Sequence, residues 1–174
     1  MTGAAQAHTE VFSGDDEARR AALGARLAGT NIDETTFLAT DYLNHFNEIV
    51  MLLDMVPDMP DIFEEASAWR PKDYCDHFRD SAFSDKDLAI AAYEAAPPIH
   101  RGPFDETFAR MNDAIMSTLD RIEAAIADGD EQTVRRFATE TSRSVQKLID
   151  VASAIIHGTT TTMEQDAIDA LLES

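Results

Sequence analysis

The stretch DYLNHFNE at residues 41–48 is a polar interruption in an otherwise apolar segment of the chain. If this segment is helical, Asp41, Asn44 and Glu48 share one outward stripe opposite Phe46 and Ile49. An amide can orient an attacking water molecule, and a nearby acid can pair with a cation. Asp41 and Asn44 are therefore the first candidate catalytic pair. A solvated helix face, or a polar contact with another helix, is the alternative interpretation of the same stripe.

Gln146 and Asp150 form the second candidate pair. They lie four residues apart and point outward on the last long predicted helix. Gln146 is expected to sit level with Asn112 on the preceding helix, because both lie 17 residues from Gly129. This pair ranks below Asp41 and Asn44.

The histidines and the cysteine predict no metal site. The chain has one cysteine, Cys75, and no pair of cysteines at zinc-ligand spacing. No histidine follows a glutamate at the Glu-x-x-His spacing of di-iron bundles. The five histidines are scattered along the chain: His8, His45, His77, His100 and His157.

His45 is the one candidate for a phosphoacceptor of a histidine phosphotransfer bundle. It falls at the edge of the apolar face of its predicted helix. The residues that follow it, Phe46-Asn47-Glu48, are neither small nor basic, unlike the neighbours typical of that family. We therefore rank this alternative below the amide–acid pairs.

Helical periodicity recurs throughout, and no alternating β-branched run appears, so the fold class is predicted to be all-α. Two long helices separated only by Asp128-Gly129-Asp130 must be antiparallel neighbours. We expect a disordered N-terminus at 1–14, a helical bundle domain at 15–158, and a linker with a partner-binding peptide at 159–174. Helices are expected at about 15–28, 33–56, 61–69, 72–80, 85–96, 103–127 and 131–157.

The C-terminal residues predict a short amphipathic helix on a flexible tail. Thr162 and Gln165 have the spacing of a capping box, and Ile168, Leu171 and Leu172 share one edge. A helix this short is unstable alone in water, so it should order on a partner. The predicted partner-binding residues are Gln165, Asp166, Ile168, Asp169, Ala170, Leu171 and Leu172.

Residues 165–172, QDAIDALL, resemble the peptide with which the flagellar switch protein FliM binds the phosphorylated response regulator CheY. The tail of the chemotaxis phosphatase CheZ is similar, and the long hairpin followed by a linker resembles its layout. The chain departs from the FliM pattern at Glu164, where serine is usual, and at Ala167, where an acid is usual.

The resemblance implies a chemotaxis or two-component signalling protein that binds a CheY-like response regulator and accelerates its dephosphorylation. Such a phosphatase needs no cofactor of its own, because the regulator brings the magnesium and the aspartyl phosphate. Asp41-x-x-Asn44 resembles the Glu-x-x-Asn pair of the CheC and CheX phosphatases, with a shorter acid. A non-enzymatic adaptor and an oligomerisation bundle remain alternatives, and a homodimer is left open.

Charge restricts the partners further. The 174 residues contain 14 Lys and Arg against 33 Asp and Glu, a formal net charge of −19. This charge repels phosphate backbones and anionic lipid surfaces, so nucleic acid and membrane partners are not expected. Without a basic and apolar leader or a long apolar run, we expect a cytoplasmic protein.

Overall fold

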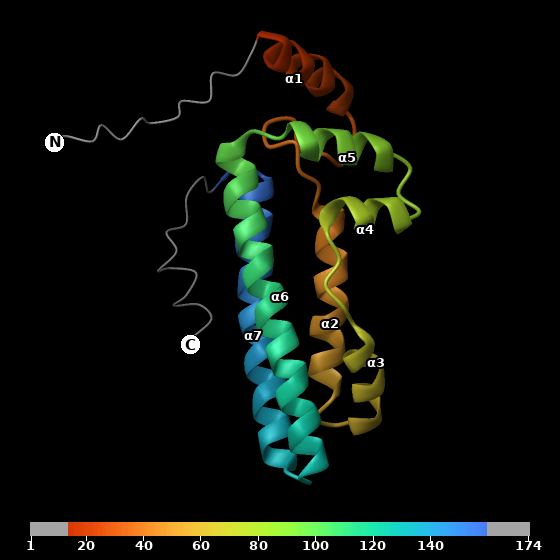
Figure 1. Cartoon of the computed structure of the whole chain (residues 1–174), viewed down its shortest axis with the longest axis vertical. Coiled ribbons are helices and arrows are strands. Elements are labelled where there is room, and N and C mark those ends of the chain that lie inside the picture. The colour runs from red at the N-terminus through yellow and green to blue at the C-terminus, as the bar shows by residue number, and fades with distance from the viewer. Residues whose placement is uncertain (1–13, 160–174) are drawn as a thin grey trace, which may run out of the picture.

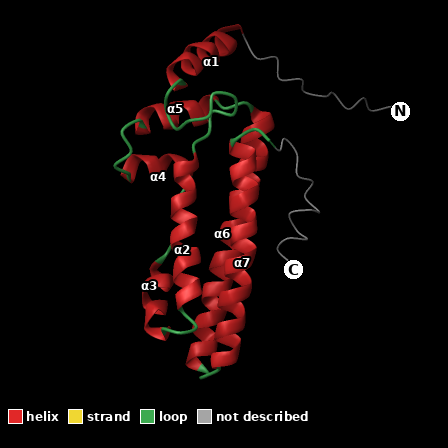
Figure 2. Cartoon of the chain, turned by 180° about the vertical axis from the view of Figure 1, so that it is seen from behind, coloured by secondary structure: helices red, strands yellow, loops and turns green. Residues whose placement is uncertain are grey.

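The computed structural model describes residues 14–159, which fold into helices joined by short loops (Figures 1 and 2). The predicted all-α class is confirmed. Within this range the one β feature is an isolated bridge between Ile32 and Ala39. The helices are α1 (Gly14–Leu27), α2 (Leu43–Met55), α3 (Phe63–Ala68), α4 (Tyr74–Asp80), α5 (Lys86–Ala95), α6 (Pro98–Ala127) and α7 (Glu131–Ile156).

The two long helices α6 and α7 pack against each other as an antiparallel hairpin, as predicted (Figure 1). Gly129 takes a positive φ of 70° at the turn, a conformation that costs glycine little. Asp130 caps α7 by accepting a hydrogen bond from the Thr133 N–H. Across the hairpin the hydroxyls of Thr118 and Thr141 lie 2.7 Å apart. Residues equally far from Gly129 are therefore level to within about one residue.

Helix α2 packs along this hairpin and runs parallel to α6, giving a three-helix bundle (Figures 1 and 2). Its inner residues Phe46, Ile49 and Leu53 are completely buried. At its far end, the Ser142 hydroxyl of α7 donates a hydrogen bond to the Asp54 carboxylate. The bundle therefore buries one face of α2 and leaves the opposite face outside.

The prediction of one helix over 33–56 is wrong in its first third. The Asp33 carboxylate accepts hydrogen bonds from the N–H groups of Thr35 and Thr36, at 2.8 and 2.9 Å. Phe37 then adopts a positive φ of 64°, which no α-helix tolerates. A 3₁₀ turn at Thr40–Tyr42 leads directly into α2 at Leu43. The local Asp33 turn competes successfully with the helix.

Helix α6 begins at Pro98, five residues before the predicted start at Pro103. Pro98 occupies the first helical turn, where its missing N–H costs nothing. Pro103 lies inside the helix and removes only the bond that would reach the Ile99 carbonyl. The Ile99 residue is 58% exposed, so water can reach this end of the helix.

An aromatic cluster joins the upper end of the bundle to α4. Tyr42 lies 4.6 Å from Phe108 and 5.3 Å from Tyr74, measured between ring centroids. Phe104 and Phe108 are 4.5 Å apart on α6, and Phe46 is 4.9 Å from Phe108. Such pairs contribute roughly 0.5–1.5 kcal/mol each beyond the area they bury.

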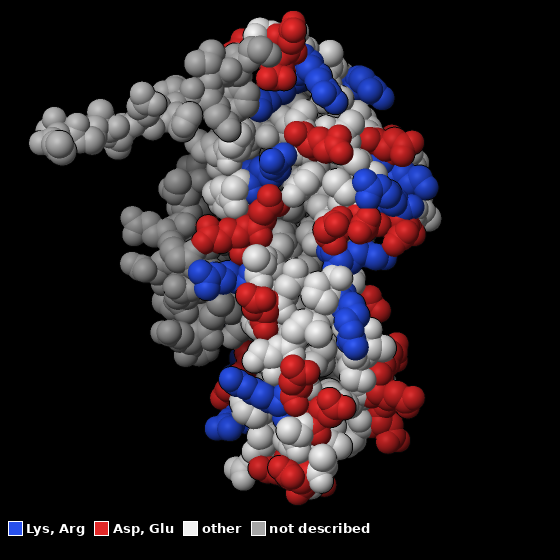
Figure 3. All heavy atoms as spheres, viewed as in Figure 1, with Lys and Arg blue, Asp and Glu red and all other residues white. Residues whose placement is uncertain are grey.

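The predicted termini at 1–14 and 159–174 lie almost entirely outside the described residues. None of the helices in the described part of the chain is long and apolar enough to cross a membrane. Acidic side chains are spread over much of the visible face, with Lys and Arg interspersed (Figure 3).

We predict that Thr36→Val lowers the free energy of unfolding by about 1–3 kcal/mol, because a buried carbonyl loses its donor. Thr36 is completely buried, and its hydroxyl donates to the Ile156 carbonyl at the end of α7. Urea denaturation measures the difference. The neighbouring Thr35 is exposed, so Thr35→Val is the matched control. Equal effects of the two substitutions would contradict the assigned role of this hydrogen bond.

Candidate functional site

The outward face of α2 carries the first candidate pair. Asn44 and Glu48 are exposed, and Asp41 is half-buried in the 3₁₀ turn just before the helix. Met51 is 55% exposed on the same helix. The face therefore offers an amide, carboxylates and an apolar side chain, whereas the opposite face is buried in the bundle. Phe37, four residues before Asp41, is buried and does not contribute to this face.

The backbone around Asp41 is fixed by hydrogen bonds from both sides. The Ala39 N–H donates to the Tyr74 hydroxyl at 2.9 Å. The Tyr42 hydroxyl donates to the Lys72 carbonyl, and its ring packs in the aromatic cluster. Asp41 is thus presented by a short turn with little freedom to move, which is what a positioned carboxylate requires.

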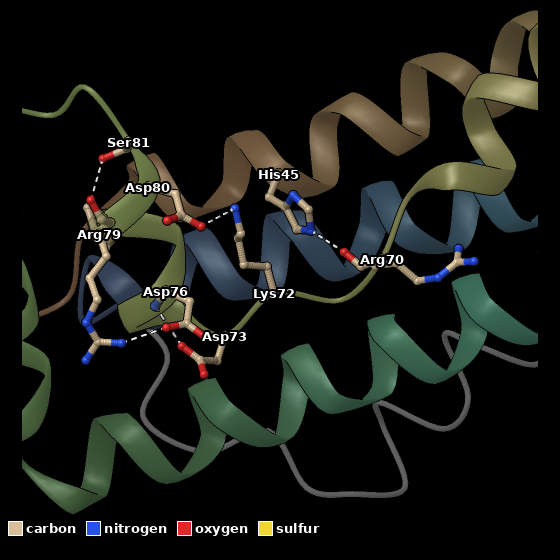
Figure 4. Close-up of polar contacts among 9 residues, drawn as sticks. His45, Arg70, Lys72, Asp73, Asp76, Arg79, Asp80 and Ser81 are labelled. Carbon is tan, nitrogen blue, oxygen red and sulfur yellow. Dashed lines mark hydrogen bonds and ion pairs between the residues drawn. The ribbon is translucent and has the colours of Figure 1, made fainter.

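His45 is covered by the segment that connects α3 to α4 (Figure 4). Its Nε2 donates to the Arg70 carbonyl at 2.8 Å, and the Trp69 Nε1 donates to the His45 carbonyl at 3.0 Å. The imidazole stacks on Trp69 with ring centroids 4.7 Å apart. Because Nε2 must carry the proton in this bond, it is not a free nucleophile. The arrangement is structural and does not favour phosphotransfer through His45.

One exposed ion pair joins the connecting segment to α4, and a second lies within α4. The Lys72 ammonium lies 2.8 Å from the Asp80 carboxylate, and Arg79 lies 2.6 Å from Asp76 (Figure 4). All four side chains are at least one third exposed, so each pair contributes little alone. Lys72 also lines the 390 Å³ cavity beside His45 and Glu48.

The second candidate pair, Gln146 and Asp150, is exposed on α7. The Gln146 amide lies 3.4 Å from the Ser142 hydroxyl, which in turn donates to Asp54 of α2. Helices α2 and α7 are antiparallel and meet at the contact between Asp54 and Ser142. Asn47 lies two helical turns before Asp54, and Asp150 lies about two turns after Ser142, so Asn47 and Asp150 are at about the same height in the bundle. The two candidate pairs therefore lie on adjoining faces of the bundle.

Asn47 and Asp54 lie along the edge of α2 that adjoins α7, and the sequence interpretation did not single them out. Asn47 is exposed three residues after Asn44, and Asp54 follows it by seven residues, which is two helical turns. That heptad spacing was the available signal. It could not be used without knowing that α7 lies against this edge of α2.

Asn112 is level with Gln146, but it faces a different surface. It lines a 300 Å³ cavity together with Tyr42 and Lys72. Its buried Oδ1 has no hydrogen-bond partner among the described residues. The expected amide pair across the hairpin therefore does not form one site.

Metal binding and the C-terminal tail are the two remaining features to compare with this site. Among residues 14–159, no group of three or more His, Cys, Asp or Glu side chains is placed to hold a metal ion. The predicted partner-binding residues from Gln165 to Leu172 lie outside the described residues.

We predict that acidification below pH 6.5 destabilises the fold through His45 and His77. Burial lowers the pKa of His45 from its ordinary value of 6.5, although the Arg70 carbonyl opposes this shift. Burial, followed by the nearby His45 ring, likewise lowers the pKa of His77. The unfolded chain therefore binds protons first, so stability is full above pH 6.5 and falls below it.

The measurement is the free energy of unfolding between about pH 7.5 and about pH 5. The double variant His45→Gln/His77→Gln should show a shallower slope than the wild type. His157→Gln, which removes an exposed histidine, is the control. A double variant with the wild-type slope would contradict this account.

Comparison with protein-family models, with curated protein sequences and with solved structures finds no match to this chain.

Proposed function

We propose that this protein binds a CheY-like response regulator and accelerates hydrolysis of its aspartyl phosphate. The observation that carries the proposal is the outward face of α2, where Asn44 and Met51 are exposed on a helix buried on its other side and the half-buried Asp41 lies in the 3₁₀ turn just before it. The resemblance of residues 165–172 to CheY-binding peptides supplies the partner.

The proposed reaction needs only two side chains from this protein. The regulator contributes the acyl phosphate, its magnesium ion and a lysine close to the phosphate. Asn44 then orients the attacking water, and Asp41 pairs with the lysine. No catalytic base is required, because positioning and charge stabilisation supply most of the acceleration in phosphoryl transfer.

The bundle keeps this face rigid. Phe46 and Ile49 are fully buried directly behind the exposed stripe, and the 3₁₀ turn at Asp41 is tied to Tyr74 and Lys72. Docking therefore orders few side chains of the bundle, which lowers the entropic cost of reaching the reactive geometry.

The tail and the α2 face have separate tasks in this mechanism. The tail holds the regulator near the bundle and raises its effective concentration at the α2 face. The face itself then acts on the phosphoryl group. Loss of the tail and loss of the face should consequently give different kinetic defects.

We predict that Asn44→Ala slows dephosphorylation by roughly two orders of magnitude, because the positioned amide acts mainly in the transition state. The phosphoryl-aspartate lifetime of the regulator is measured with saturating protein. Binding of the regulator should change little, since the tail is intact. Asn31→Ala, which removes an exposed amide from the loop before α2, is the matched control.

Gln146→Ala distinguishes the second candidate pair from the first. If Gln146→Ala alone lengthens the lifetime, the site lies on α7 with Asp150. If the wild-type protein leaves the lifetime unchanged although it binds the regulator, it is an adaptor. The proposal of a phosphatase is then overturned, and the α2 face becomes a contact surface.

A further inference from the structure

An open groove of 750 Å³ runs along α6 and α7 and is separate from the α2 face described above. Its α6 wall contains Arg110 and Arg121, and its α7 wall contains Arg143 and Lys147. Two acids, Asp113 and Glu140, also line it. We call this surface the α6–α7 groove.

The charge of the groove is opposite to that of the protein. Four cationic side chains against two carboxylates give the lining a net positive charge, whereas the whole chain carries a formal net charge of −19. Basic residues concentrated in a groove of so acidic a protein attract an anionic segment and hold it in register.

The floor of the groove suits close approach by a helix. Ala114, Ser117 and Ser144 are small, and the hydroxyls of Thr118 and Thr141 are hydrogen-bonded to each other. At the lower end the half-buried Phe137 ring lies beneath the Arg121 guanidinium, 5.5 Å from its centroid. The groove thus combines basic walls, a shallow floor and one apolar end.

The chain carries a segment of matching charge. Residues 160–174 contain Glu164, Asp166, Asp169 and Glu173 and no Lys or Arg. Their aliphatic edge, Ile168, Leu171 and Leu172, is the surface predicted to bind partners. Among the residues outside the described range, no other segment is both this acidic and edged by aliphatic side chains.

The lengths also agree. Thr159 is hydrogen-bonded back to the Ala154 carbonyl, so the tail leaves the bundle near Ala154. An extended chain from Thr159 to Met163 spans about 13 Å, and the stretch of α7 from Ala154 back to Lys147 is about 11 Å long. A helix from Met163 to Leu172 is about 14 Å long, and the α7 wall from Lys147 to Phe137 measures about 15 Å. The tail can therefore fold back and place Leu171 and Leu172 near Phe137.

We propose that residues 163–173 dock into the α6–α7 groove of their own chain. On a helical wheel Glu164 and Asp169 border the aliphatic edge, so their carboxylates pair with the basic walls while that edge covers the floor and Phe137. Asp166 and Glu173 lie on the opposite side of the helix and add only longer-range attraction to the basic groove. Because the same edge is proposed to bind the regulator, docking competes with regulator binding. The intramolecular contact itself does not depend on that function.

The test uses the full chain with one spin label. Cys75 is replaced by Ser, Ser174→Cys is labelled with a nitroxide, and paramagnetic broadening of backbone amide signals is recorded by NMR. Docking predicts broadening concentrated at residues 137–147 and 110–121. Arg121→Glu/Arg143→Glu should reduce it several-fold, as should a rise from about 0.05 to about 0.5 M salt.

A matched control and a mixing experiment make each outcome decisive. Arg26→Glu reverses an exposed charge on α1 and should leave the broadening unchanged. Broadening that is absent, evenly spread or insensitive to the groove substitutions overturns the proposal. In the mixing experiment, isotope-labelled protein without the nitroxide is combined with unlabelled protein that carries it. Broadening of the amide signals in this mixture would mean that the tail docks on a second copy, which also overturns the intramolecular contact. Circular dichroism checks that each variant is folded.

Discussion

The antiparallel packing of α6 on α7 is the contact on which the rest of the molecule depends. It is set by a three-residue turn, in which Gly129 takes the positive φ and Asp130 caps the next helix. Only when the two long helices are paired is there an apolar surface on which α2 can bury Phe46 and Ile49. The loop before α2 is tied to the same hairpin, because the Thr36 hydroxyl donates to the carbonyl of Ile156, the last residue of α7.

The second organising element is the aromatic cluster around Tyr42. It fixes the start of α2 against α6 and, through Tyr74, also fixes α4. The stacked pair of His45 and Trp69 closes one side of α2 with the connecting segment. What remains of the surface of α2 is a narrow exposed strip, bordered by that segment on one side and by α7 on the other. The exposure of Asn44 and Met51 is thus a consequence of how the bundle is closed.

The periodicity of the sequence predicts most of this architecture, including the hairpin and the all-α class. It fails before α2, because the apolar residues Phe37 and Leu38 fit a helical pattern while the Asp33 side chain stabilises a turn. The outward direction of Asn44 and Gln146 follows from the helical wheel. The contact of Asp54 with Ser142 of α7, and the stacking of His45 on Trp69, depend on tertiary contacts that no local pattern encodes.

We propose that the C-terminal residues recruit a CheY-like regulator to this rigid bundle. The most direct measurement is titration calorimetry of purified receiver domains from the same organism with the wild-type protein and with Ile168→Ala/Leu171→Ala. We expect micromolar binding of at least one phosphorylated receiver, weakened tenfold or more by the double substitution, because two buried aliphatic side chains contribute several kcal/mol. Binding of no receiver, or equal affinities of the two proteins for every receiver, would contradict the claim.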